Sequence, residues 1–138
     1  MMKVGVIVFS PTGTTAQNCK TIADAIPEAE AEMINITLPA ERDKLMADPS
    51  ALVEPYDRLL FGVPVYAGKV PAFAWDLLKD IRGQGKPATA VVVYGNRDYG
   101  VSLQTLTNLL SGNGFVVDSA GAFIGQHSYC DLMPVAVG

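Results

Sequence analysis

The stretch that decides the fold runs from residue 3 to residue 15 and reads KVGVIVFSPTGTT. Its first part, Lys3–Phe9, is rich in β-branched residues and apolar at nearly every position, as a strand buried on both faces requires. Its second part is a hydroxyl-rich loop with one glycine, placed directly before a helical pattern that begins at Thr15. A buried strand followed at once by a helix predicts the first unit of an α/β fold with a parallel sheet.

The same alternation continues along the chain. Four further apolar runs have the length of strands: Ala31–Ile36, Arg58–Val65, Ala88–Gly95 and Phe115–Ile124. Helical patterns separate the runs at Thr15–Ile26, Ala40–Ala47, Ala72–Arg82 and Val101–Ser111. Alternating buried strands and amphipathic helices predict a doubly wound α/β domain with a five-stranded parallel sheet. Right-handed crossovers then place helices on both faces of that sheet.

The length of 138 residues fits one domain over residues 1–138. After the fifth strand only Gly125–Gly138 remains, and Pro134 interrupts it, so a closing helix of normal length does not fit there. Either the domain lacks its last helix, or the chain was cut from a longer polypeptide, and we favour the cut. Apolar surface beside the first, third and fifth strands would then be uncovered, which predicts self-association, for example as a homodimer.

Composition and charge exclude several classes of protein. With 49% apolar and 17% charged residues, the chain can build a core and does not read as disordered. No apolar run approaches the roughly 18–20 residues that span a bilayer. The formal charge of −4 and the lack of a basic patch argue against nucleic acid or an anionic membrane as a partner. A mild acidic excess fits a soluble cytoplasmic protein.

Side chains typical of metal sites and hydrolytic centres are scarce. Cys19 and Cys130 lie far apart without a CxxC motif, which argues against a zinc site, a cysteine-ligated cluster and a disulfide framework. Cys19 shares a helical face with Ala16 and Ala23, so we expect a small buried residue there. The one histidine, His127, belongs to no Ser/His/Asp or Cys/His arrangement in the sequence, and hydrolytic functions are not supported.

Three loops leave the carboxyl ends of the first, third and fourth strands, where open α/β sheets bind ligands. The first loop offers four hydroxyls and a glycine at a helix N-terminus, which exposes unpaired N–H groups and the positive end of the helix dipole. This combination predicts a phosphate site without Lys or Arg, and a ligand-free Ser/Thr-rich helix cap is the alternative. A Gly-Lys-Ser/Thr ending is missing, so nucleoside triphosphate hydrolysis is disfavoured. The candidate residues are Ser10, Thr12, Gly13, Thr14 and Thr15.

The second and third loops could hold a flat ring. The second runs from Pro64 to Pro71 and contains Tyr66, which can stack on a ring, and Gly68, which lets the backbone approach a ring edge. The third is polar and aromatic, so it could read the edge of a heteroaromatic ring. For each loop the alternative is an ordinary strand-to-helix turn. The candidates are Pro64, Tyr66, Ala67, Gly68 and Lys69 in the second loop and Tyr94, Gly95, Asn96, Asp98 and Tyr99 in the third.

Phe9–Thr15 resembles the phosphate-binding loop of the flavodoxins, and the other two loops are similar to the two loops that flank the isoalloxazine ring in that family. The resemblance extends from Lys3 to about Ile124. Tyr94–Tyr99 looks most like the flavodoxin half of two-domain flavodoxin/ferredoxin-type electron-transfer proteins, in which an iron–sulfur domain follows. The resemblance implies a flavodoxin-like sheet order of 2-1-3-4-5, non-covalently bound FMN, and electron transfer with a redox partner protein or iron–sulfur domain. A missing last helix departs from the family's pattern.

In such a protein the first loop would hold the FMN phosphate, and Tyr66 together with Tyr94 or Tyr99 would contact the ring. The backbone beside Gly68 would face the flavin N5, and Lys69 would favour reduced flavin unless it is a solvated surface lysine. Two alternatives stay open. The chain could be an NAD(P)H-dependent flavin or quinone reductase on the same fold, or a cofactor-free interaction module that kept the fold and lost the flavin.

Overall fold

The computed structural model describes residues 2–10, 13–64, 72–94, 102–124 and 129–134. The strands are β1 (Met2–Val8), β2 (Ala29–Asn35), β3 (Arg58–Pro64), β4 (Pro87–Tyr94), β5 (Val116–Ile124) and β6 (Tyr129–Pro134). The first five pair in parallel in the order β2-β1-β3-β4-β5, which confirms the predicted sheet. The sequence analysis missed β6, which pairs antiparallel with β5 and stands where a closing helix would otherwise begin.

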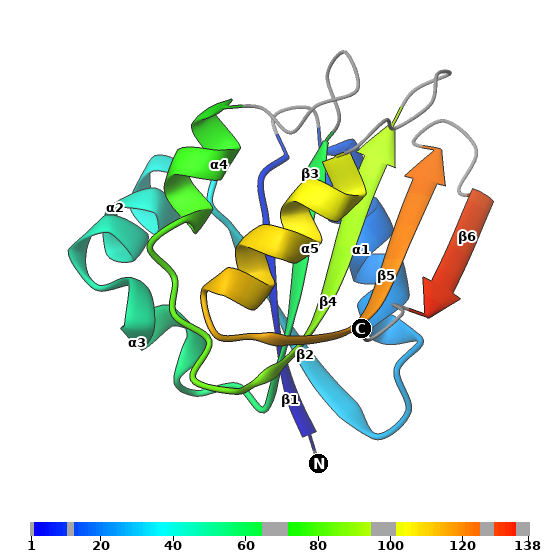
Figure 1. Ribbon diagram of the computed structural model, residues 1–138, viewed down its shortest axis with the longest axis horizontal. Helices are drawn as coiled ribbons and strands as arrows, with labels where there is room; N and C mark the ends of the chain where they lie inside the picture. The colour runs from blue at the N-terminus through cyan, green and yellow to red at the C-terminus, as the bar shows by residue number, and fades with distance from the viewer. Residues whose placement is uncertain (1, 11–12, 65–71, 95–101, 125–128, 135–138) are drawn as a thin grey trace.

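Helices cover the two faces of the sheet unequally. The described helices are α1 (Thr14–Asp24), α2 (Pro39–Ala47), α3 (Pro49–Val53), α4 (Ala72–Leu78) and α5 (Ser102–Gly112). In Figure 1, α4 and α5 lie in front of the sheet with α2 and α3 to their left, whereas α1 lies behind it. The strand order reverses after β2, and right-handed crossovers on either side of that reversal place their helices on opposite faces.

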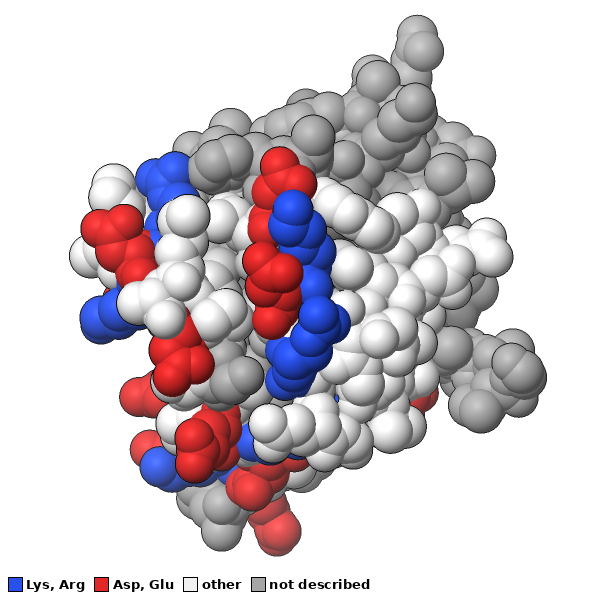
Figure 2. Space-filling model, turned by 60° about the vertical axis from the view of Figure 1, so that its left-hand side comes forward, with Lys and Arg blue, Asp and Glu red and all other residues white. Residues whose placement is uncertain are grey.

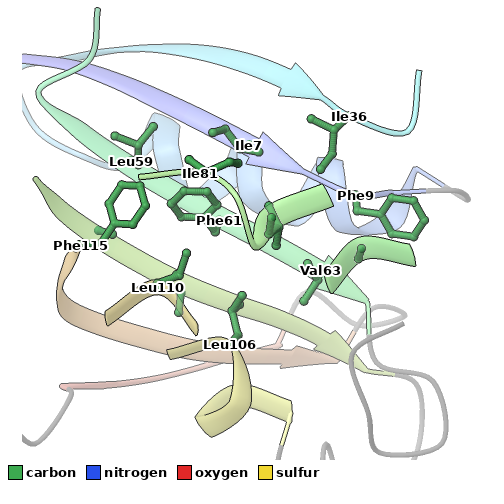
Figure 3. Close-up of a cluster of buried hydrophobic side chains, with 14 of the residues drawn as sticks. Ile7, Phe9, Ile36, Leu59, Phe61, Val63, Ile81, Leu106, Leu110 and Phe115 are labelled. Atoms are coloured by element: carbon green, nitrogen blue, oxygen red, sulfur yellow. The ribbon is translucent and has the colours of Figure 1, made fainter. Parts of the chain in front are cut away.

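The larger of two core clusters fills the space between the sheet and helices α2 to α5 (Figure 3). Phe61 of β3 packs edge-on against Phe115, with ring centroids 5.0 Å apart and planes at 72°. Leu106 and Leu110 of α5 are fully buried, and their spacing of four residues places both on the helix face toward the sheet. Burying each of these leucines contributes on the order of 2 kcal/mol, so this cluster fixes how α5 lies over β4 and β5.

The smaller cluster joins α1 to the opposite face and includes Val4, Val6, Leu60 and Cys19. Cys19 is fully buried, as predicted, and burial raises the pKa of its thiol to about 12. A Cβ on Gly62 of β3 would lie 2.2 Å from the Cys19 Sγ, so only glycine lets α1 approach the sheet this closely.

Two local differences from the predicted elements have clear causes. Helix α4 ends at Leu78 rather than at residue 82, because the Asn113 side-chain amide donates to the carbonyls of Leu78 (3.2 Å) and Lys79 (3.1 Å). The short helix α3 was not predicted at all. At and just after the C-terminal end of α3, the carbonyls of Val53, Glu54 and Tyr56 accept hydrogen bonds of 2.7 to 2.9 Å from the Lys86 Nζ. Both elements therefore depend on a side chain more than 30 residues away.

The α1 face of the sheet contains a groove with a volume of about 830 Å³. Helix α1 contacts β1 to β4 and leaves the β5 side of this face without a described helix. The apolar lining comes from α1, the residues just after it and three strands, and includes Met2, Ile22, Ala25, Ile26, Pro27, Leu60 and Phe123. Met2, Leu60 and Phe123 belong to β1, β3 and β5, but Leu60 and Phe123 are only 1% and 3% exposed, so uncovered apolar surface beside these strands stays a prediction.

A polar cluster lies at the β5 side of this groove. The register of β4 and β5 shifts between Ala88 and Thr89, which pair with Val117 and Ser119, so Asp118 is an extra residue in β5. Arg58 Nη1 donates to Asp118 Oδ1 (2.8 Å) and to Thr89 Oγ1 (3.1 Å), and the Thr89 and Ser119 hydroxyls share a hydrogen bond of 2.8 Å. The hydrogen bonds from the Arg58 guanidinium hold the pKa of the Asp118 carboxyl below its usual value.

Candidate functional site

The three predicted loops leave the same edge of the sheet. Parallel pairing aligns Val8 of β1 with Gly62 of β3, and Pro64 of β3 with Val93 of β4, so the carboxyl ends of these strands lie side by side. The structure describes six of the predicted site residues: Ser10, Gly13, Thr14, Thr15, Pro64 and Tyr94. The others lie outside the described residues: Thr12, Tyr66, Ala67, Gly68, Lys69, Gly95, Asn96, Asp98 and Tyr99.

The first loop ends in a glycine that sets the direction of α1. Gly13 is the N-cap of the helix and has φ 84°, in the left-handed region, which glycine adopts without strain. Its N–H donates to the Ser10 carbonyl at 3.3 Å, and its carbonyl accepts the Gln17 N–H at 3.1 Å. No atom would contact a Cβ within 4 Å, so backbone conformation and not crowding calls for glycine here. Helix α1 therefore starts beyond the end of β1, with Gly13 exposed at its N-cap.

Ser10 serves the helix. Its side chain is 5% exposed, and its Oγ accepts the N–H of Ala16, in the first turn of α1, at 3.0 Å. This bond satisfies one of the donors that a helix N-terminus leaves unpaired, so Ser10 caps α1 from six residues away. The sequence analysis assigned Ser10 to direct phosphate binding, and the structure adds this structural role.

Thr15 is also buried, with an exposed fraction of 2%. Its Cγ2 would lie 3.3 Å from a Cβ on Gly62, so its side chain helps to seat α1 on β3. The buried Ser10 and Thr15 side chains thus contact the protein itself, and the backbone N–H groups of the first helical turn lie at the positive end of the helix dipole.

One residue of this region escaped the sequence analysis. Thr37, two residues after the end of β2, accepts the Ser10 N–H on its Oγ1 at 2.6 Å. The signal for it was indirect: β2 neighbours β1 in the sheet, so the residues that follow β2 must lie near the residues that follow β1. Its position was predictable, but its contact with Ser10 was not.

Two residues of the predicted ring loops are described. Pro64 is buried at the last position of β3, and Tyr94 is half-buried at the end of β4. Tyr94 packs against the larger core cluster, together with Val92 and Ala90, which precede it at alternate positions of the strand. It therefore lies on the face that α4 and α5 cover.

Neither positive nor negative side chains predominate on the side of the molecule that carries α2, α3 and α4 (Figure 2). Acidic and basic residues are interspersed there, and two exposed pairs join Lys44 to Glu41 at 3.6 Å and Lys79 to Asp76 at 3.7 Å. Among the residues that the structure describes, no His, Cys, Asp or Glu side chains group as metal ligands, and no helix is long and apolar enough to span a membrane.

Comparison with known proteins adds a family and a fold. The model of a family described as NADPH-dependent FMN reductase matches residues 2–129. The apo crystal structure of an NADH:FMN oxidoreductase is similar with a TM-score of 0.71 at 19% identity, over 91% of this chain and 76% of that chain. A Fusobacterium nucleatum flavodoxin bound to flavin mononucleotide gives 0.61 at 19% identity, over 86% of this chain and 71% of that chain.

An azoreductase from Bacillus anthracis gives a TM-score of 0.63 at 11% identity, over 91% of this chain and 88% of that chain. No curated protein matches the sequence. At these identities the structural likeness shows the flavodoxin-like fold, which agrees with the resemblance seen in the first loop.

Proposed function

Since the chain belongs to the NADPH-dependent FMN reductase family, we propose that it binds FMN at the carboxyl ends of β1, β3 and β4 and transfers electrons through it. The observation that supports this proposal is the start of α1 beyond the end of β1, where Gly13 is the N-cap and Ser10 binds the first turn. Backbone N–H groups and hydroxyls there suit a phosphate monoester without a cationic side chain.

In this proposal each part of FMN is assigned to residues of the three loops. The N–H groups of Thr14 and Thr15, with the hydroxyl of Thr12, would hold the phosphate. Tyr94, at the end of β4, and Tyr66 or Tyr99 would bound the ring, and backbone near Gly68 would meet its edge. The remaining candidates of the second and third loops, Pro64, Ala67, Lys69, Gly95, Asn96 and Asp98, would shape the ring site.

When bound, FMN would supply the redox chemistry by accepting a hydride or single electrons. The protein would orient it: the first loop would anchor the phosphate, so that the ring lies over the ends of β3 and β4. Phosphate binding without Lys or Arg leaves a charge that the α1 dipole partly compensates. The two ring loops would limit the access of water and decide which partner reaches the ring.

We propose that the protein uses NADPH or NADH to reduce its bound FMN. The family match and the similarity to the NADH:FMN oxidoreductase both support this activity. A one-electron carrier is the second candidate, favoured by the flavodoxin-type first loop and by the flavodoxins of the same fold. A carrier would work with a redox partner protein or iron–sulfur domain, and a reductase of this kind commonly works as a homodimer. For either activity we propose the cytoplasm as the location, where NADPH and NADH are supplied.

The test begins with an absorbance spectrum of the purified protein before and after FMN is added. Bound-flavin bands near 370 and 450 nm, roughly where oxidised flavin absorbs, are expected. Anaerobic NADPH or NADH should then bleach the bound flavin rapidly if the protein is a reductase. Slow bleaching by either nucleotide, with reduction by dithionite through a stable intermediate, would favour the carrier. A protein that takes up no FMN in excess would contradict both and leave the cofactor-free interaction module.

A further inference from the structure

The backbone hydrogen bonds that join β1 to its neighbours β2 and β3 end where the first loop begins. The last backbone bond between the β1 and β2 regions runs from the Ile36 N–H to the Val8 carbonyl, at 2.9 Å. On the other side of β1, the Phe9 N–H donates to the Gly62 carbonyl of β3 at 3.0 Å. Ser10 is thus the first residue of the loop that the sheet no longer holds through its main chain.

A side chain takes over at that point. The Ser10 N–H donates to the Thr37 Oγ1 at 2.6 Å, across 27 residues of sequence. Because Ser10 is 5% exposed, its N–H would have little access to water if this acceptor were removed. The Thr37 hydroxyl therefore continues the β1–β2 ladder by one position beyond the backbone.

Thr37 is itself fixed on two sides. Its N–H donates to the Asn35 Oδ1 at 3.1 Å, and its carbonyl accepts a bond from Arg42 Nη2 at 3.4 Å. The next residue, Leu38, is the N-cap of α2 and donates its N–H to the Asn35 carbonyl at 3.1 Å. The hydroxyl of Thr37 is thus part of a tight turn between β2 and α2 and is not a mobile surface group.

Ser10 passes this restraint on to the helix. Its carbonyl accepts the Gly13 N–H at 3.3 Å, and its Oγ accepts the Ala16 N–H at 3.0 Å. A shift of Ser10 would therefore shift both the glycine that starts α1 and the first turn of the helix. This is the backbone to which the proposed function assigns the phosphate.

We propose that Thr37 is a positioning residue for the phosphate end of FMN, an inference that rests on the proposed function. Thr37 does not touch the ligand in this scheme. It fixes Ser10, and Ser10 fixes the N–H groups that receive the phosphate. The chemistry predicts a selective effect: loss of the Thr37 hydroxyl weakens binding of flavins that carry the phosphate and leaves binding of the ring unchanged.

The experiment compares FMN with riboflavin, which has the ring but lacks the phosphate, by titration of flavin fluorescence. Thr37→Val keeps the shape of the side chain and removes the acceptor. We expect about tenfold weaker FMN binding, because Ser10 is no longer fixed in the position that the phosphate requires, with riboflavin affinity unchanged. Thr37→Ser keeps the oxygen and should restore FMN affinity. The matched control is Thr107→Val on α5, a half-buried threonine whose hydroxyl bonds only within its own helix, to the Leu103 carbonyl at 2.8 Å.

Unchanged FMN affinity in Thr37→Val would overturn the inference, and so would an equal loss for FMN and riboflavin, which indicates general loosening. If the unmodified protein binds neither flavin, the proposed function fails, and this inference fails with it. Amide hydrogen exchange of the apo protein gives a second readout, since the Ser10 N–H should exchange faster in Thr37→Val. Should that variant not fold, Asn35→Ala removes the acceptor of the Thr37 N–H and should give the same selective loss of FMN affinity.

Discussion

At the scale of single residues, some hydroxyls at the first loop hold the loop in place and are not left for a ligand. The Ser10 Oγ accepts the Ala16 N–H, and the Thr37 Oγ1 accepts the Ser10 N–H. Polar groups are also paired in the groove on the α1 face of the sheet, where Arg58 binds Asp118. In each case the polar side chain is already hydrogen-bonded to a residue of another segment of the chain.

Asp118 links stability to pH. The Arg58 guanidinium lowers the pKa of this carboxyl, so the unfolded chain, with a carboxyl pKa of about 3.9, binds the proton more readily. The contribution of the pair is fully present above about pH 5 and is lost as the pH falls through the unfolded-state value toward the lower folded-state value. Since the Asp118 side chain is 41% exposed, solvent screening keeps the effect modest.

Urea unfolding at a series of pH values checks this. The free energy of unfolding should fall more steeply below about pH 5 in the unmodified protein than in Asp118→Asn. Asp24→Asn, at the exposed Lys20–Asp24 pair on α1, is the control and should keep the steep profile. Identical pH profiles for the unmodified protein and Asp118→Asn would contradict the assignment.

At the scale of elements, the position of α1 depends on Gly62 of β3, which has no side chain to keep the helix away from the sheet. A Cβ on Gly62 would lie 2.2 Å from the Cys19 Sγ and 3.3 Å from the Thr15 Cγ2. We expect Gly62→Ala to lower the free energy of unfolding by about 1–3 kcal/mol, because the helix must move off the sheet to make room. Thermal and urea unfolding measure the loss.

A double variant tests the cause. Cys19→Ala removes the sulfur atom, so Gly62→Ala should cost less in the Cys19→Ala background than alone, with a coupling of about 0.5–3 kcal/mol. Gly112→Ala is the control, since no atom lies within 4 Å of its added Cβ and the position ends α5. Additive losses in the double variant would show that the sulfur contact does not set the position of α1.

Patterns local in sequence predicted most elements, and long-range contacts explain the rest. The five parallel strands were predictable because each is a continuous apolar run, and their order followed from the resemblance of the loops. The end of α4 was not predictable, because the Asn113 amide that binds its last carbonyls lies 34 or 35 residues further along the chain. The antiparallel strand β6 was missed because residues 129–134 read YCDLMP, which lacks both alternation and a strong apolar run.

The candidate site divides in the same way. Hydroxyl-rich sequence before a helix predicted the position of the first loop, since that chemistry is contained in six consecutive residues. Thr37 could not be found from its own surroundings, because its role comes from lying next to Ser10 after β1 and β2 separate. The roles given to the second and third loops stay predictions.

At the scale of the whole molecule, the two faces of the sheet differ in how they are covered. Helices α4 and α5 lie over one face and α1 over the other (Figure 1). On the α1 face a groove of about 830 Å³ remains beside β5. A parallel sheet is normally buried on both faces, so this groove favours contact with other apolar surface. We therefore propose that the chain self-associates through the α1 face.

Sedimentation velocity over a wide concentration range tests this proposal. The unmodified chain should show concentration-dependent association. Ala25→Glu, which places a charge on the lining of the groove, should weaken it, while Ala47→Glu at the exposed end of α2 should not. A chain that stays monomeric at every concentration would contradict self-association.

Alkylation of Cys19 can measure the rate at which α1 detaches from the sheet. Its thiol is fully buried and its pKa is raised to about 12, so an alkylating reagent can reach a thiolate only after the helix detaches locally. In a Cys130→Ser chain, alkylation at high reagent concentration should level off at the rate of that detachment. Added FMN should slow the reaction if its phosphate rests on the first turn of α1, because a ligand that binds only the closed form reduces the open population. A single buried sulfur atom would thus report, in the time course of one covalent reaction, both the local stability of α1 and the occupancy of its N-terminus.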